Sequence, residues 1–463
     1  MSQKPKLSVT GYRAIWGQDL NEQIAFEYAR SFARMIADAN KGKDKVKVLV
    51  GRDARHSGPN IFHAAEEALE KEHIEVTYAG ILPTPSMLLL TKKLGFDGGI
   101  MITASHNPPE YNGVKFIMPD GMLTNEAQTA EIEKWRAALA GADKIPSLPP
   151  DSAEPASDNA EFRMIHAQEV LKHVDADLIR SKKFTVALDS INSGGGPFAQ
   201  ELLARLGCEV HGINQTPDGN FAHTPEPLEK NLTDTLAFMK SVTHDVGFVQ
   251  DPDADRLVLV NERGEFILEE LMVSLVIKSV LSRAKEEEHE SATVVNLSTT
   301  RVCEDVAREY GARFYRTKVG EANVVQKMIE VGAHVGGEGS GGAIFPAVGY
   351  FRDSLSGMAL VLDLLARDGR KISEIVASFP KYVMQKDKFD FQGDLSTVYA
   401  KLKEKFADAE INTLDGVRFD WADNSWVHIR PSNTEPIVRA FGEALDQNRI
   451  NAIFEQVRLT LGA

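Results

Sequence analysis

Short runs of apolar, β-branched residues alternate with longer amphipathic segments along most of the chain. Three such runs lie at residues 46–53, 184–190 and 292–300, and each precedes a helix-patterned segment of ten or more residues. Strands that alternate with helices predict βαβ units and a largely parallel sheet. The three runs therefore predict three similar α/β domains with mixed, largely parallel sheets.

The end of the chain follows a different pattern. Its strands and helices are predicted in α+β order, which indicates a smaller C-terminal domain. A stretch rich in Pro and Ser at residues 144–158 is typical of a linker. A length of 463 residues suits three or four domains. We expect four domains, with bounds 1–155, 156–258, 259–376 and 377–463.

Composition and charge exclude several classes of protein. The chain has 67 acidic and 52 basic residues, a formal charge of −15, which argues against a nucleic-acid partner. Two cysteines are too few for a disulfide framework or a four-cysteine zinc site. No apolar run is long enough to cross a bilayer, and the first residues lack the apolar core of a signal peptide. We expect a cytoplasmic protein without a membrane partner.

The first loop with candidate chemistry follows the apolar run GGIMI, and we call residues 103–110 the serine loop. Ser105 and His106 pair a nucleophile with a proton acceptor, and the Asn-Pro-Pro that follows predicts a turn exposing the serine oxygen. A capping loop is the commoner role of an isolated Ser-His pair. A lipase nucleophile elbow is excluded, because no Gly-x-Ser-x-Gly surrounds Ser105.

The second loop, residues 251–256, is called the aspartate loop. Asp251, Asp253 and Asp255 alternate, so hard oxygen ligands lie on one side of an extended segment, as Mg²⁺ prefers. An EF-hand also has this spacing, but Arg256 stands where that loop requires glycine, and a strand follows. An acidic surface loop without metal is the remaining alternative, although three packed carboxylates repel one another.

The third loop, residues 336–342, is rich in glycine and is called the glycine loop. Glycine lets the backbone approach a ligand closely, and Glu338 and Ser340 offer an acceptor and a donor for sugar hydroxyls. The loop lacks the Gly-Lys-Ser/Thr ending of a P-loop. A flexible linker explains its composition equally well.

The fourth loop reads Arg-Pro-Ser-Asn-Thr-Glu-Pro from residue 430 and is called the arginine loop. An arginine, two hydroxyls and an amide around a tight turn form a small anion cradle. An ordinary β-turn is the alternative for this string alone.

These four loops, in this order, resemble those of the α-D-phosphohexomutase family, which includes phosphoglucomutase, phosphomannomutase and phosphoglucosamine mutase. The matching segments are TASHNPPEYNGVKF, DPDADR, GGEGSGG and RPSNTEP, with VTGYRAIWG and GRD near the N-terminus. The resemblance covers essentially the whole chain. It implies four domains around a central cleft. It also implies reversible interconversion of hexose 1-phosphate and hexose 6-phosphate through a phosphoserine enzyme and a 1,6-bisphosphate intermediate.

The resemblance also implies a role for each matching residue. Ser105 would carry the phosphoryl group, flanked by His106. The metal ligands would be Ser105, Asp251, Asp253 and Asp255. Orientation of substrate, proton transfer and charge stabilisation would fall to Arg13, Lys115, Arg256 and Lys318. The substrate would be held by Glu338, Ser340, Arg430, Ser432, Asn433 and Thr434.

The same resemblance implies Mg²⁺ and an activating hexose 1,6-bisphosphate as cofactors, sugar phosphates as partners, and a monomer or homodimer. The sugar is glucosamine, mannose or glucose, and the glycine loop favours glucosamine. Gly342 and Glu321 stand where many bacterial members have histidine, and RDSLSGM replaces a more usual RDG-type helix start. These departures concern the sugar preference. Lys115, Arg13, Lys318 and Glu321 are all candidates for the general base.

Two other functions compete with a mutase. A sugar-phosphate phosphatase would use the same phosphoserine and lose its phosphoryl group to water. A non-catalytic sugar-phosphate binder would have no reason to retain Ser105 and three clustered aspartates.

Overall fold

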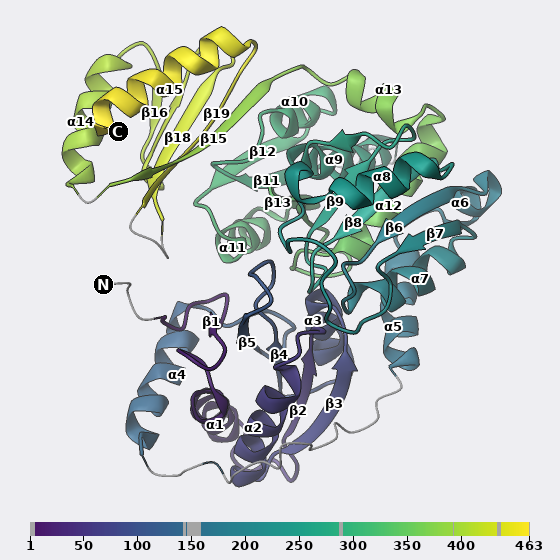
Figure 1. Ribbon diagram of the computed structural model, residues 1–463, viewed down its shortest axis with the longest axis vertical. Helices are drawn as coiled ribbons and strands as arrows, with labels where there is room; N and C mark the ends of the chain where they lie inside the picture. The colour runs from purple at the N-terminus through teal and green to yellow at the C-terminus, as the bar shows by residue number, and fades with distance from the viewer. Residues whose placement is uncertain are drawn as a thin grey trace. The chain divides into compact units, whose positions relative to one another are not determined.

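The computed structural model describes residues 5–141, 145, 159–286, 290–391, 393–432 and 437–462 (Figure 1). Apart from Ile145, the predicted linker at 144–158 lies outside these described residues. The chain forms two compact units, which we describe separately. The larger unit comprises residues 4–272 and 342–372, and the smaller one comprises residues 1–3, 273–341 and 373–463.

The larger unit begins with a five-stranded mixed sheet. Its strands are β1 (Tyr12–Ile15), β2 (Lys47–Arg52), β3 (Glu75–Ile81), β4 (Gly98–Ile102) and β5 (Tyr111–Ile117). Their order is β1-β5-β4-β2-β3, with β2 parallel to β3 and β4, and β5 antiparallel to β4 and β1. The accompanying helices are α1 (Glu22–Ala39), α2 (Gly58–Lys71), α3 (Thr84–Lys93) and α4 (Glu126–Leu139). Tyr28, Phe32 and Ile36 lie on one face of α1 and are buried in the core of this domain.

A second mixed sheet repeats this topology. Its strands are β6 (Thr185–Asp189), β7 (Glu209–Ile213), β8 (Val246–Gln250), β9 (Leu257–Val260) and β10 (Phe266–Ile267). Their order is β10-β9-β8-β6-β7, with β6 parallel to β7 and β8, and β9 antiparallel to β8 and β10. The helices are α5 (Ala160–Leu171), α6 (Ala176–Lys182), α7 (Gly195–Arg205), α8 (Thr233–Ser241) and the 3₁₀ helix η1 (Glu229–Asn231).

The larger unit also contains β14 (Gly342–Ile344) and α12 (Ser354–Asp368). Helix α12 is buried along almost its whole length, and its middle, from Gly357 to Leu362, is entirely apolar. Asp353 caps its N-terminus by accepting hydrogen bonds from the backbone N–H groups of Leu355 and Ser356.

The smaller unit contains a third parallel set of strands. These are β11 (Ala292–Asn296), β12 (Arg313–Thr317) and β13 (Val335–Glu338), with β11 paired to both others. The helices are α9 (Glu269–Glu286), which begins just before the unit, α10 (Val302–Glu309) and α11 (Glu321–Val331). Helix α10 has 8 residues, so the predicted length of ten or more is wrong here. It ends early because Gly311 adopts the left-handed conformation that terminates helices.

The rest of the smaller unit has an antiparallel sheet. Its elements are α13 (Ile372–Ala377), β15 (Val383–Asp390), α14 (Leu395–Lys405), β16 (Glu410–Asn412), β17 (Val417–Asp420), β18 (Trp426–Pro431), β19 (Ile437–Ala444) and α15 (Gln447–Leu461). The strand order is β15-β19-β18-β17-β16. Figure 1 shows α15 lying along this sheet, where Ile450, Phe454 and Val457 join its buried core. The predicted α+β domain at the C-terminus is confirmed.

The repeated topology places three of the candidate loops at equivalent positions. The serine loop follows β4, the aspartate loop follows β8, and the glycine loop begins at the end of β13. Strand β4 pairs in parallel with β2, β8 pairs in parallel with β6, and β13 pairs in parallel with β11. Loops at the carboxyl ends of parallel strands are the usual location of active sites in such sheets. Among the described residues, no helix is long and apolar enough to cross a membrane.

Candidate active site

Ser105 occupies a tight turn at the start of the serine loop. Its φ of 51° lies in the left-handed region, which a residue other than glycine adopts only when its surroundings hold it there. The side-chain oxygen lies 3.4 Å from Asp251 Oδ2 and 3.4 Å from His106 Nδ1. The expectation of an exposed nucleophile is wrong for this conformation, because Ser105 is only 1% exposed. The aspartate loop and His106 cover it.

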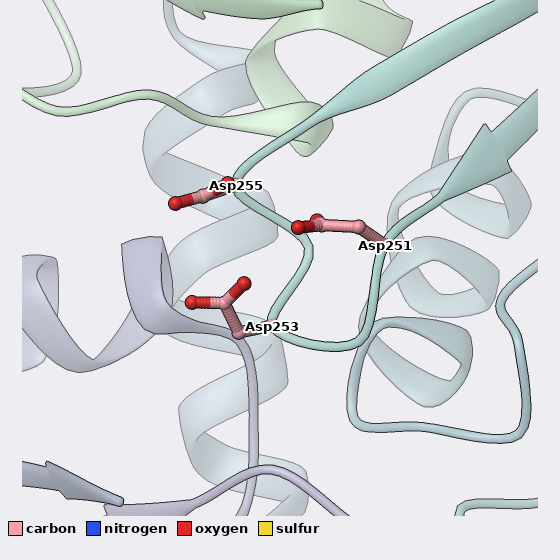
Figure 2. A group of neighbouring side chains, drawn as sticks. All are labelled: Asp251, Asp253 and Asp255. Atoms are coloured by element: carbon pink, nitrogen blue, oxygen red, sulfur yellow. The ribbon is translucent and has the colours of Figure 1, made fainter. Parts of the chain in front are cut away.

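The aspartate loop turns between β8 and β9 and gathers its three carboxylates. Figure 2 shows the side chains of Asp251, Asp253 and Asp255 directed toward a common space, and their ligand atoms lie within 4.8 Å of one another. All three residues are buried, which excludes an acidic surface loop. The flanking elements are strands rather than a helix pair, so the EF-hand alternative is also excluded.

In Asp253 and in Asp255, one carboxylate oxygen contacts a basic side chain and the other has no hydrogen-bond partner. Asp253 Oδ2 accepts hydrogen bonds from Lys115 Nζ and Thr84 Oγ1, both at 2.6 Å. Asp255 Oδ2 pairs with Arg352 at 2.5 Å. Oδ1 of each aspartate is buried without a hydrogen-bond partner. Buried oxygens of this kind fit the oxygen-ligand preference of a hard divalent cation, so these residues could hold one.

The pKa shifts of the aspartates agree with a cation site. Burial, followed by the charges of Asp255 and Asp253, raises the pKa of Asp251 well above its usual value. Burial also opposes ionisation of Asp253, but Lys115, Thr84 and Arg13 together lower its pKa. Bringing a divalent cation to this cluster would relieve the mutual repulsion that raises the pKa of Asp251.

Positive side chains surround the carboxylates. Arg13 and Lys115 act on Asp253, Arg352 pairs with Asp255, and the backbone N–H of Arg256 donates to Asp251 Oδ1 at 3.1 Å. Four basic residues therefore lie around the three carboxylates, and one of them, Arg256, also pairs with Glu226 at 3.6 Å, so basic side chains gather here in a chain of net charge −15. Such a centre suits a phosphoryl group that carries two negative charges.

His106 is uncharged at neutral pH in this environment. The charge of Arg256, followed by burial, lowers the pKa of His106 well below its usual value. A neutral imidazole can accept a hydrogen bond or a proton through the nitrogen that carries no hydrogen. His106 is therefore equipped to accept a proton close to Ser105 Oγ.

In the smaller unit, the glycine loop is ordered by hydrogen bonds and is not a flexible linker. Glu338 ends β13, and its Oε1 accepts hydrogen bonds from Asn296 Nδ2 and from the backbone N–H of Gly320, both at 2.9 Å. The N–H of the next residue, Gly339, donates to Thr299 Oγ1 at 3.0 Å. These contacts fix Glu338 beside the segment that precedes α11.

Asp415 links the arginine loop to this same segment. Its Oδ2 accepts from Arg430 Nε at 3.1 Å and from the backbone N–H of Val319 at 3.0 Å. Val319 follows the exposed Lys318. Ser432 closes the end of β18 by donating its backbone N–H to Ile437 O at 2.9 Å. The predicted residues Asn433 and Thr434 lie outside the described residues.

The larger unit brings together eight of the predicted site residues: Arg13, Ser105, His106, Lys115, Asp251, Asp253, Asp255 and Arg256. The smaller unit contains Lys318, Glu338, Ser340, Arg430 and Ser432.

Sequence reasoning missed several residues that contact this set. Thr84 and Arg352 bind the aspartates, and Asp415 binds Arg430. Arg352 belongs to the RDSLSGM segment that the sequence relates only to sugar preference, yet it touches a carboxylate of the aspartate loop. A charged pair directly before a mostly apolar helix was the signal that could have identified it.

In the comparison with known proteins, four domain models of one protein family match successive parts of the chain. Models of the phosphoglucomutase/phosphomannomutase alpha/beta/alpha domains I, II and III match residues 5–139, 165–264 and 269–382. The model of the C-terminal domain of the same family matches residues 390–460. All four domains are therefore present in the order that the family has.

Individual relatives agree with this assignment. A phosphoglucomutase/phosphomannomutase of Thermococcus kodakarensis is 33% identical over 96% of this chain and 96% of its own. A phosphoglucosamine/phosphogalactosamine mutase of Sulfurisphaera tokodaii is 31% identical over 97% of both chains. Among solved structures, a phosphoglucomutase/phosphomannomutase family protein of Burkholderia thailandensis is similar with a TM-score of 0.82. It is 27% identical, and the match covers 100% of this chain and 98% of that protein.

Proposed function

The chain belongs to the phosphoglucomutase/phosphomannomutase family, and from this premise we propose that it interconverts hexose 1-phosphates and hexose 6-phosphates with Ser105 as phosphoryl carrier. The observation that carries this proposal is the position of Ser105 Oγ, 3.4 Å from a carboxylate of the three-aspartate cluster. A hydroxyl beside a candidate cation site that is surrounded by basic side chains suits reversible phosphoryl transfer.

Mg²⁺ is the cation that we propose for this cluster, held by Asp251, Asp253, Asp255 and the oxygen of phosphorylated Ser105. When bound, it would neutralise negative charge on the transferring phosphoryl group. The unpartnered Oδ1 atoms of Asp253 and Asp255 support this ligand set. Hexose 1,6-bisphosphate would serve as the activator that first phosphorylates the serine.

The reaction that we propose moves one phosphoryl group in each of two transfers. The bond from phosphorus to Ser105 Oγ breaks while a bond forms to the oxygen of the free sugar hydroxyl; that hydroxyl loses its proton, and Ser105 Oγ gains one to become a hydroxyl again. After the bisphosphate turns around, the other phosphoryl group returns to Ser105. Lys115 Nζ lies 2.6 Å from Asp253 Oδ2, and we propose that it stabilises negative charge during the transfer. His106, neutral and 3.4 Å from Ser105 Oγ, is the group that we propose as proton acceptor in this unit.

The smaller unit would bind the rest of the substrate. We propose that Glu338 and Ser340 contact sugar hydroxyls and that Lys318 stabilises charge. The non-reacting phosphate would be held by Arg430 and Ser432, together with Asn433 and Thr434. Because one cradle must accept either end of the sugar, it belongs in a domain of its own, within the bounds 377–463. The sugar that we favour is glucosamine, with mannose and glucose as alternatives.

A phosphatase would require water at the phosphoserine. The test is a panel of glucosamine, mannose and glucose 1-phosphates with Mg²⁺ and a trace of glucose 1,6-bisphosphate, followed by ³¹P NMR. Formation of 6-phosphate supports the proposal. Release of inorganic phosphate without isomerisation would instead establish a phosphatase.

A further inference from the structure

A buried ion pair lies directly beneath the serine loop. Asp53 and Arg55 follow β2, and their side chains are 0% and 1% exposed. Arg55 Nε donates to Asp53 Oδ2 at 3.0 Å, and its guanidinium stacks 5.1 Å from the ring of Phe221. Neither residue is one of the predicted site residues.

Every N–H of the Arg55 guanidinium has a partner. Beyond the bond from Nε to Asp53, four remain, and all four donate to backbone carbonyls of the serine loop and the residue after it. The acceptors are the carbonyl oxygens of Ser105 at 2.6 Å, Asn107 at 2.7 Å, Pro108 at 2.6 Å and Tyr111 at 2.8 Å. A planar fork that saturates four carbonyls fixes the shape of the whole turn.

The Asp53–Arg55 pair also holds the backbone N–H of Ser105, through Thr103. Thr103 Oγ1 donates to Asp53 Oδ2 at 2.6 Å and accepts from the backbone N–H of Ser105 at 2.8 Å. Asp53 therefore holds the N–H of Ser105 through one hydroxyl, while Arg55 holds its C=O directly. Between these two contacts Ser105 adopts its left-handed φ of 51°.

The pair is also joined to the aspartate loop. The backbone N–H of Ala54, between the two charged residues, donates to Ser193 Oγ at 3.3 Å, and Ser193 Oγ donates to Pro252 O at 2.6 Å. Pro252 lies between Asp251 and Asp253. One buried hydroxyl thus connects the segment that shapes the serine loop with the segment that carries the carboxylates.

We propose that Asp53, Arg55 and Thr103 are positioning residues that hold Ser105 in its left-handed turn and so set the place of Oγ relative to the aspartate loop. This inference rests on the proposed phosphoryl transfer to Ser105. A left-handed serine is costly unless its surroundings determine it, and a displacement of about 1 Å at a reacting atom can cost about 100-fold in rate.

The test compares Thr103→Val, which removes the hydroxyl at nearly constant volume, with Thr103→Ser, which retains it. Arg55→Lys keeps the positive charge but loses the planar guanidinium that donates to four carbonyls. Arg30→Lys is the matched control. Arg30 pairs with Glu72 between α1 and α2, in the same domain and away from the serine loop. Each protein is mixed with ³²P-labelled glucose 1,6-bisphosphate and Mg²⁺, and the rate of Ser105 labelling is measured beside steady-state kcat and KM. Thermal unfolding checks that each variant is folded.

We expect Thr103→Val and Arg55→Lys to lower the labelling rate and kcat by about 10- to 100-fold, with KM changed less than about threefold. Thr103→Ser and Arg30→Lys should retain the wild-type rate. The valine–serine pair carries the test if Arg55→Lys does not fold.

Equal rates for Thr103→Val and wild type would overturn the inference, as would a serine variant as slow as the valine variant. A loss in kcat that matches the unfolded fraction would also overturn it. Failure of the wild type itself to take up label would reject the proposed function, and this inference with it.

Discussion

Acidification should weaken the smaller unit through one buried histidine. His428 lies in β18 with 0% exposure. Its Nδ1 lies 2.8 Å from Ser298 Oγ and its Nε2 lies 2.6 Å from Asp415 O. Nε2 can only donate to a carbonyl, so a neutral ring has its acceptor at Nδ1, ready for the serine hydroxyl. Protonation would put a second donor on the ring and a charge in a buried site.

The size of this effect follows from the pKa of His428. Burial, helped by the charges of Arg418 and Arg430 and opposed by Asp415, lowers this pKa from 6.5 to about 4. The unfolded chain therefore binds more protons than the folded chain below about pH 6.5. The stabilisation is fully present above that pH and is lost as the pH falls toward 4. At pH 4.5 the loss attributable to His428 is about 2 to 3 kcal/mol.

The assay is urea unfolding of wild type and His428→Gln at pH 7.5 and pH 4.5. Glutamine can still donate to Asp415 O but does not titrate in this range. Two of the four tryptophans, Trp421 and Trp426, lie in this domain, so part of the change in tryptophan fluorescence on unfolding reports on it. Wild type should lose about 2 to 3 kcal/mol more than the variant on acidification. His211→Gln, at a side chain 37% exposed, is the control and should behave as wild type. Identical pH dependence of wild type and His428→Gln would show that protonation of His428 does not destabilise the smaller unit.

Three further changes test the proposed chemistry. Ser105→Ala removes the phosphoryl carrier and should reduce kcat by about 10³-fold or more; retention of most turnover would show that another group carries the phosphoryl. Asp253→Asn should raise the Mg²⁺ concentration for half-maximal activity by about 10- to 100-fold, measured by metal titration; an unchanged titration would reject the metal site. Arg430→Ala should raise the half-saturating substrate concentration by about 10- to 100-fold, measured by initial rates; unchanged kinetics would exclude this loop from substrate binding.

The chemistry of the loops could be predicted because the residues of each loop are close together in the sequence. The alternating aspartates need only an extended segment to gather their oxygens, and the structure brings them within 4.8 Å. The fold class was also predictable, since the alternation of strands and helices fixes which sheets are parallel. Both depend on residues that are neighbours in sequence.

Contacts between distant segments could not be predicted in this way. Arg352 and Asp255 are 97 residues apart, and Thr84 and Asp253 are 169 apart. The hydrophobic pattern of one segment gives no information about such pairs. They form only when the domains of the larger unit pack against each other. The burial of Ser105 has the same origin, because the aspartate loop that covers it comes from the second sheet.

The central claim is that Ser105 passes a phosphoryl group to a sugar. The most direct measurement loads the protein with ³²P from glucose 1,6-bisphosphate, removes excess label, and adds unlabelled hexose 1-phosphate in a single turnover. The account predicts that label leaves Ser105 and appears first in the hexose bisphosphate and then in hexose 6-phosphate. Label found only as inorganic phosphate, or label that remains on the protein, would contradict it.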